Sequence, residues 1–308
     1  MNQIRLPILG DPESMPRPRV TVAWLSIGFR PFFVAAALHA AIFIPWWIVR
    51  LAGGGAPTAG AWLPIWWHAH EMLFGFTLAV IAGFLLTAVR NWTGRDTARG
   101  PALVGLLGLW LLGRVAMWMQ TWLPEEWVAV AVMAFPVALI VAVGRPLLAA
   151  RSRRNYGILV VLGLLALSCA LMHLQAAAGD ARALLRCVLV SVHLLVLLNV
   201  VIGGRVIPMF TWAATRGAPI HGWPLADLLA PVASFGLMLA VAMSASGAVF
   251  AGIAAVAGAI NLLRMIPWCS RAALRVPLVL VLHVGYAWIG IGQLLLAASA
   301  AGLPLAES

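Results

Sequence analysis

The sequence predicts an all-α protein, a polytopic membrane helix bundle of about nine transmembrane helices with its N-terminus in the cytoplasm. Of its 308 residues, 63% are hydrophobic and only 9% are charged, whereas a soluble domain carries about a quarter charged residues. Apolar runs close to the roughly 20 residues that a helix needs to cross a bilayer recur along the chain. The loops between them differ strongly in arginine content, as expected for a membrane protein. The lipid bilayer is therefore the expected surrounding of this chain.

Nine apolar runs qualify as spans. They cover residues 30–49, 69–89, 101–119, 126–144, 156–174, 183–203, 225–243, 245–263 and 276–300. A tight turn at Ser244 and Ser246 is expected to separate the seventh span from the eighth, and Gly203-Gly204-Arg205 is expected to form a turn after the sixth. The predicted organisation is a cytoplasmic N-terminal segment (1–29), a transmembrane helical domain (30–303) and the expected start of a further helix (304–308).

The arginine distribution predicts the orientation. With a cytoplasmic N-terminus, sixteen of the twenty arginine residues lie on the cytoplasmic side. Only Arg50, Arg182 and Arg186 lie on the opposite side, and Arg114 lies within a span. The net charge of +11 comes from short basic clusters between apolar runs, whereas nucleic-acid-binding proteins gather basic residues into one patch. No nucleic acid partner is therefore expected.

Histidine residues are the main candidates for chemistry, because ionisable groups inside hydrocarbon are costly and usually functional. His68 and His70 begin the second span, two residues apart, which is about 200° on a regular helix. They therefore cannot both bind one metal ion. His68 shares a helix face with Glu71 at i+3, and a carboxylate that accepts the second ring N–H commonly orients a metal-binding histidine. The alternative is an interfacial histidine that caps the helix or contacts water.

The other histidine residues differ in their setting. His193 and His283 lie inside the sixth and ninth spans, where a neutral imidazole suits iron or copper. They could instead donate to carbonyl groups of neighbouring helices, which is the favoured interpretation for His39. Met172-His173 ends the fifth span and suggests copper, although methionine is also common in bilayer helices. His221 is interpreted as a solvated loop residue.

Two further patterns support structural interpretations. Gly75, Ala79 and Gly83 repeat at four-residue spacing in the second span, which favours close helix packing. The three cysteine residues show no CxxC or other metal-type spacing, so no disulfide framework is expected. They are Cys169, Cys187 and Cys269.

Several motifs, in order along the chain, resemble the NnrS family over about residues 28 to 300. They are GFRPFF (28–33), WHAHEMLFGF (67–76), AGFLLTAV (82–89), NWTG (91–94), GGRVIPMFT (203–211) and HVGYAW (283–288). The resemblance implies a multi-pass protein of the bacterial cytoplasmic (inner) membrane that contains haem and copper and acts in nitric oxide metabolism and protection against nitrosative stress. Family members usually have more spans than nine, so a continuation beyond Ser308 is expected.

The resemblance and the histidine pattern together predict a haem site, with copper as a second cofactor. The predicted metal ligands are His70, His193 and His283, and His68 with Glu71 forms an external pair that binds a second metal or orients the first. Arg205 is expected to neutralise a haem propionate through a charge-assisted pair, and Tyr286 to support the site.

The expected activity is to bind or metabolise nitric oxide, with electrons from an unidentified donor. Whether this is catalysis, binding or sensing stays open. Two alternatives remain: a proton-coupled membrane transporter without redox chemistry, which would use the buried histidines and Glu71 as a proton path, and an assembly subunit.

Overall fold

A computed structural model describes residues 23–52, 62–215 and 222–303. These ranges are almost entirely helical, and no strand occurs in them. The elements are η2 (Ala23–Leu25), α1 (Phe29–Leu51), α2 (Pro64–His70), the π-helical segment η3 (Glu71–Thr77), α3 (Leu78–Thr93), α4 (Pro101–Trp118), α5 (Glu125–Ala149), η4 (Arg153–Asn155), α6 (Tyr156–Ala178), α7 (Ala181–Ala214), α8 (Pro224–Ala242), α9 (Gly247–Met265), η5 (Ile266–Trp268), α10 (Arg271–Leu274) and α11 (Pro277–Ala300).

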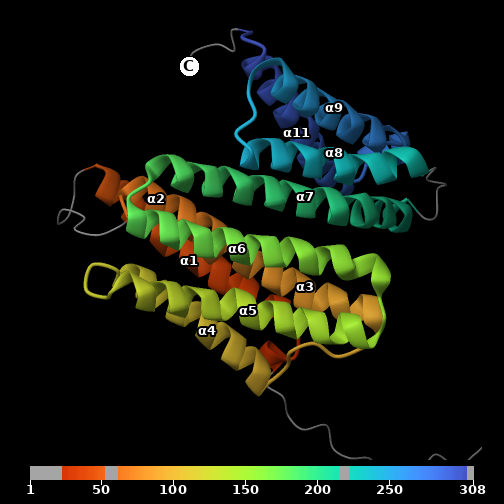
Figure 1. Ribbon diagram of the computed structural model, residues 1–308. Coiled ribbons are helices and arrows are strands. Elements are labelled where there is room, and N and C mark those ends of the chain that lie inside the picture. Colours follow the sequence, from red (N-terminus) through yellow and green to blue (C-terminus); the bar gives the residue numbers. More distant parts are fainter. Residues whose placement is uncertain (1–22, 53–61, 216–221, 304–308) are drawn as a thin grey trace, which may run out of the picture.

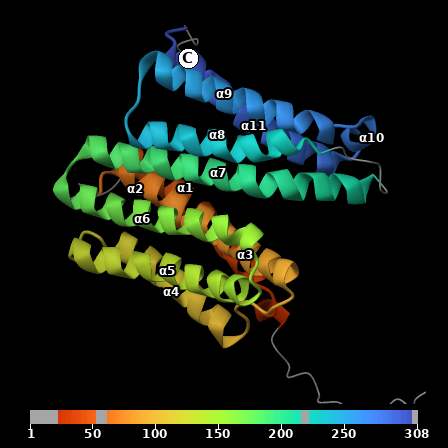
Figure 2. The same ribbon diagram turned by 45° about the vertical axis from the view of Figure 1, so that its right-hand side comes forward.

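The helices form two groups on either side of α7. Helices α1 to α6 pack together on one side, and α8, α9 and α11 form a smaller group on the other (Figures 1 and 2). Nine helical stretches in the described ranges are long and apolar enough to cross a membrane. The predicted polytopic helix bundle is therefore confirmed, and each predicted span corresponds to one of these stretches.

The predicted turn at Gly203-Gly204-Arg205 is wrong, because α7 continues through it for 34 residues, to Ala214. At about 1.5 Å per residue this helix is longer than the hydrocarbon core is thick. The two glycines serve close packing instead. The Tyr286 ring lies against Gly203, and the Arg264 guanidinium occupies the space that a Cβ at Gly204 would take.

The second span begins at Pro64, five residues before the predicted start, and changes its helical form along its length. Proline at the first helical position is well tolerated because its missing N–H would have no partner there. The π-helical segment η3 interrupts the α-helix directly after His70, and such π-helical turns occur often at functional sites. Further along, a Cβ at Gly83 would lie 2.7 Å from the Phe33 ring of α1. This contact supports the predicted packing role of the small-residue stripe.

Some predictions fall on parts of the chain outside the described residues. They are His221, most of the predicted N-terminal segment 1–29, and residues 304–308.

Candidate metal centre

Three side chains with metal-binding atoms meet between α2 and α6. The ligand atoms of His70, Cys169 and His173 all lie within 4.8 Å of one another. The three residues are buried, with exposed fractions of 0%, 0% and 2%. The cluster lies near the end of α6 and beside the start of α5, at the end of the bundle where the α4–α5 and α6–α7 connections lie (left in Figure 1). Buried groups of this kind need partners, because an unsatisfied polar atom costs free energy in an apolar interior.

Each imidazole in this cluster has a carboxylate oxygen next to its Nδ1. His70 Nδ1 lies 3.1 Å from Glu71 Oε1, and its Nε2 faces Cys169 Sγ at 3.8 Å. His173 Nδ1 lies 2.6 Å from Glu125 Oε1, and its buried Nε2 has no hydrogen-bond partner. When Nδ1–H donates to a carboxylate, Nε2 carries the lone pair. This is the arrangement by which proteins orient histidine ligands toward a metal ion.

The spacing of the donors also suits a metal ion. Bonds of about 2.3 Å to sulfur and about 2.0–2.1 Å to nitrogen, at roughly 120° to each other, place the nitrogen and sulfur atoms about 3.8 Å apart. The distance between His70 Nε2 and Cys169 Sγ is 3.8 Å. Two imidazoles and a soft thiolate form a donor set that copper favours. The residues therefore fit a copper ion.

Glu71 also belongs to a buried charge network behind His70. Arg114 donates to its Oε1, and His39 Nε2 of α1 lies 3.3 Å from its Oε2. Glu71 is 0% exposed and Arg114 5%, so each charge depends on the other, because a buried charge without a partner is strongly destabilising. Gly75 makes room for this network, since a Cβ there would lie 2.7 Å from His39 Nε2.

Trp62 covers the cluster next to Glu125. Its indole N–H donates to both carboxylate oxygens of Glu125, at 3.2 and 3.1 Å. Its ring centroid lies 5.0 Å from that of His70 and 5.1 Å from that of His173. Because Trp62 is itself 0% exposed, it keeps water away from this side of the two imidazoles.

His68 lies apart from this cluster. Its ring stacks on Trp47 with centroids 3.8 Å apart, and Glu71 bonds His70 and Arg114 in place of the expected His68. The two residues are three apart on the helix, but the Glu71 carboxylate is directed to His70 and the buried Arg114, and the His68 ring is held on Trp47. The expectation that His68 and His70 face different neighbours agrees with this arrangement.

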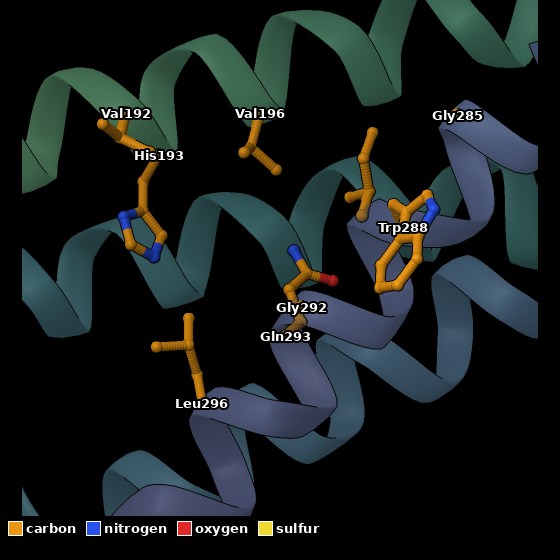
Figure 3. A pocket seen from close by; sticks show the side chains of 9 residues that line it. Val192, His193, Val196, Gly285, Trp288, Gly292, Gln293 and Leu296 are labelled. Atoms are coloured by element: carbon orange, nitrogen blue, oxygen red, sulfur yellow. The ribbon is translucent and has the colours of Figure 1, made fainter. Parts of the chain in front are cut away.

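His193 lies outside the cluster, on a groove between α7 and α11 (Figure 3). The groove has a volume of about 330 Å³ and is lined by Val192, His193, Val196, Gly285, Trp288, Ile289, Gly292, Gln293 and Leu296. His193 Nδ1 lies 2.8 Å from the carbonyl oxygen of Leu189, one turn earlier.

The remaining predicted residues lie in other surroundings. His283 has Nδ1 at 2.8 Å from the Val279 carbonyl oxygen and Nε2 at 3.3 Å from that of Trp268. The Tyr286 hydroxyl donates to Asn261 in a buried network of α9 and α11. Arg205 donates to the Asn155 side chain and to the Arg154 carbonyl oxygen. The structure thus does not bring these residues to His70.

Sequence reasoning missed Cys169, Glu125 and Trp62 as members of this centre. One signal was present, because Cys169 and His173 are four residues apart and so lie on the same face of α6. Cysteine spacing alone could not reveal it, since the third ligand comes from α2, 99 residues away. No sequence pattern links Glu125 to His173.

Comparisons with known proteins agree with the sequence motifs. A family model described as "NnrS protein" matches residues 23–308. No curated protein and no solved structure gave a match. The matched region includes every residue of the centre described above, so this chain, with its nine helices of transmembrane length in the described ranges, belongs to the NnrS family.

Proposed function

We propose that this protein is a metalloprotein of the bacterial cytoplasmic membrane that binds copper at His70, Cys169 and His173 and, together with haem, binds or metabolises nitric oxide. The observation that carries the copper site is the pair of carboxylate-held imidazoles facing a buried thiol. Membership of the NnrS family supports the link to nitric oxide.

Copper is favoured over zinc at this site by the ligand set. Two imidazoles and one thiolate are the donors found together among the described residues, and three ligands of these types are typical of copper, whereas structural zinc sites have four protein ligands. Copper when bound would supply one-electron redox chemistry to the protein.

The residues around the copper ligands have separate tasks. Glu71 and Glu125 accept the Nδ1 protons of His70 and His173 and so direct their Nε2 lone pairs at the metal. Arg114 keeps the buried Glu71 carboxylate in place, and Trp62 excludes water.

The groove at His193 is the proposed haem site. The groove has an aromatic wall in Trp288 and small residues at Gly285 and Gly292, which suit one face of a flat ring (Figure 3). His193 suits an axial ligand because a carbonyl group holds its Nδ1. The axial ligand and the pocket polarity set how a haem iron reacts with diatomic gases. His283 and Arg205 remain predictions as a second ligand and a propionate partner.

Metal analysis and absorption spectra of the detergent-purified protein test these proposals separately. We expect bound copper in the wild type and its loss in Cys169→Ser, with Cys269→Ser, at an exposed cysteine, as the control that retains it. A haem band is expected in the wild type and should be lost or shifted in His193→Ala. Protein without copper or haem that drives proton-coupled uptake into proteoliposomes would overturn the proposal in favour of a transporter.

A further inference from the structure

We propose that the His70–Cys169–His173 centre is a closed one-electron transfer site and that nitric oxide binds elsewhere in the protein. This inference rests on the proposed copper site. Three observations carry it: the enclosure of the ligands, the donor set, and a hydrogen-bonded connection from Cys169 to α7.

The ligands are enclosed on the sides that the structure describes. The Trp62 ring lies edge-on to both imidazoles at 5.0 and 5.1 Å, and Phe74 lies 5.3 Å from His70 on the π-helical segment. Trp62 is 0% exposed and Phe74 2%. Metal sites that act on substrates keep an open position, usually held by water. Buried aromatic rings therefore cover the imidazoles on these two sides.

The donor set is that of electron-transfer copper. Two histidines and one cysteine in a trigonal arrangement are typical of copper centres that pass single electrons. Both imidazoles are fixed by carboxylates, and Cys169 and His173 are fixed one turn apart on α6, so the ligands are held in place when the metal changes its charge. The Glu71 and Glu125 carboxylates behind the imidazoles offset the additional positive charge of Cu(II).

A short bonded connection leads from Cys169 to α7. Ser168 Oγ lies 2.8 Å from Ser191 Oγ, and the two oxygens lie 3.1 and 2.9 Å from the Cys187 carbonyl oxygen. Because each hydroxyl has one proton, one serine donates to the other, and the second serine donates to the carbonyl oxygen. Ser168 is 4% exposed and Ser191 0%. Since Ser168 is bonded to Cys169 and Ser191 is two residues from His193, one hydrogen bond joins the copper ligand to the groove of Figure 3.

The proposed step would transfer one electron. Copper held by His70, Cys169 and His173 would supply it on passing from Cu(I) to Cu(II), and a ferric haem held at His193 would accept it and become ferrous. No proton would be transferred, and no bond to copper would be made or broken. Nitric oxide would then bind at the haem site and not at the copper centre.

The test uses the full chain, purified in detergent and loaded with Cu(I). Oxidation by hexacyanoferrate(III) is expected to produce an intense visible thiolate-to-copper band, which ascorbate abolishes. Cys169→Ser should lose this band, and the control Cys269→Ser, at an exposed cysteine outside the connection, should keep it. Nitric oxide added without oxygen to the Cu(I) form is expected to leave its paramagnetic resonance spectrum without a copper-nitrosyl signal.

The outcomes separate the two proposals. Protein that binds no copper would overturn the copper site itself. Protein that binds copper but gives only a weak band, or forms a copper-nitrosyl, would overturn the closed electron-transfer centre and leave the copper site standing. Ser191→Ala should keep the copper band and slow the reduction of ferric haem by Cu(I). An unchanged rate would overturn the assigned route to α7.

Discussion

The two carboxylates of the metal centre allow a matched pair of substitutions, Glu71→Gln and Glu125→Gln. Each replaces a carboxylate by an amide of nearly the same shape behind one imidazole. They differ in what else they disturb. Glu71 is 0% exposed and paired with the buried Arg114, whereas the Glu125 side chain is 19% exposed and accepts from Trp62.

The expected magnitudes follow from this difference. Loss of the partner that orients a histidine ligand typically costs 10–100-fold in metal affinity, or about 1.4–2.7 kcal/mol, and both variants should show it. Only Glu71→Gln also leaves a buried guanidinium without its counter-charge, which costs about 3–5 kcal/mol. We therefore expect a large loss of folding stability in Glu71→Gln and a small one in Glu125→Gln.

Copper affinity is measured by competition with a Cu(I) chelator, and stability by detergent-resistance or thermal unfolding of the copper-free protein. The double variant Glu71→Gln/Arg114→Met removes the stranded charge and should recover most of the lost stability, but not the lost affinity. Equal instability of the two single Glu variants, or a double variant no more stable than Glu71→Gln, would show that the buried ion pair does not act as described.

Three other predictions concern packing and accessibility. Gly75→Ala should destabilise the protein by about 1–3 kcal/mol in thermal unfolding, because the added Cβ would lie 2.7 Å from His39 Nε2. Unchanged stability would contradict this close contact. Gly204→Ala should displace the Arg264 guanidinium from α7 at a similar cost, and a crosslink or unfolding assay that finds α7 and α9 undisturbed would refute it. Desolvation raises the pKa of the exposed Cys269 thiol. Because the thiolate is the reactive form, labelling of Cys269 by a maleimide should be slow near neutral pH and accelerate as pH rises. A labelling rate independent of pH would contradict this prediction.

The positions of the membrane spans were predictable because a single local requirement sets them. A helix in hydrocarbon satisfies its own backbone hydrogen bonds and needs about 20 apolar residues, so each span can be recognised without knowing its neighbours. All nine predicted spans correspond to helices of the structure. The same reasoning identified His70 and Glu71, since an ionisable residue beside hydrocarbon is conspicuous in any single segment.

Contacts between segments were not predictable in this way. α7 continues through Gly203 and Gly204, where the Tyr286 ring and the Arg264 guanidinium pack against its backbone. Glycine is read locally as a turn signal because it lacks a side chain. That same property permits close helix contact, and only the neighbouring helices decide which use applies.

The sequence by itself determined that this is a helical membrane protein of the NnrS family with histidines in or near its spans. Only the tertiary structure decided that His70 meets Cys169 and His173, while His193 and His283 lie elsewhere. Helices of similar composition can rotate about their axes at little cost in lipid, since hydrocarbon solvates every apolar face alike. Packing of small side chains and buried polar contacts sets the rotation instead, and these contacts join residues about a hundred positions apart.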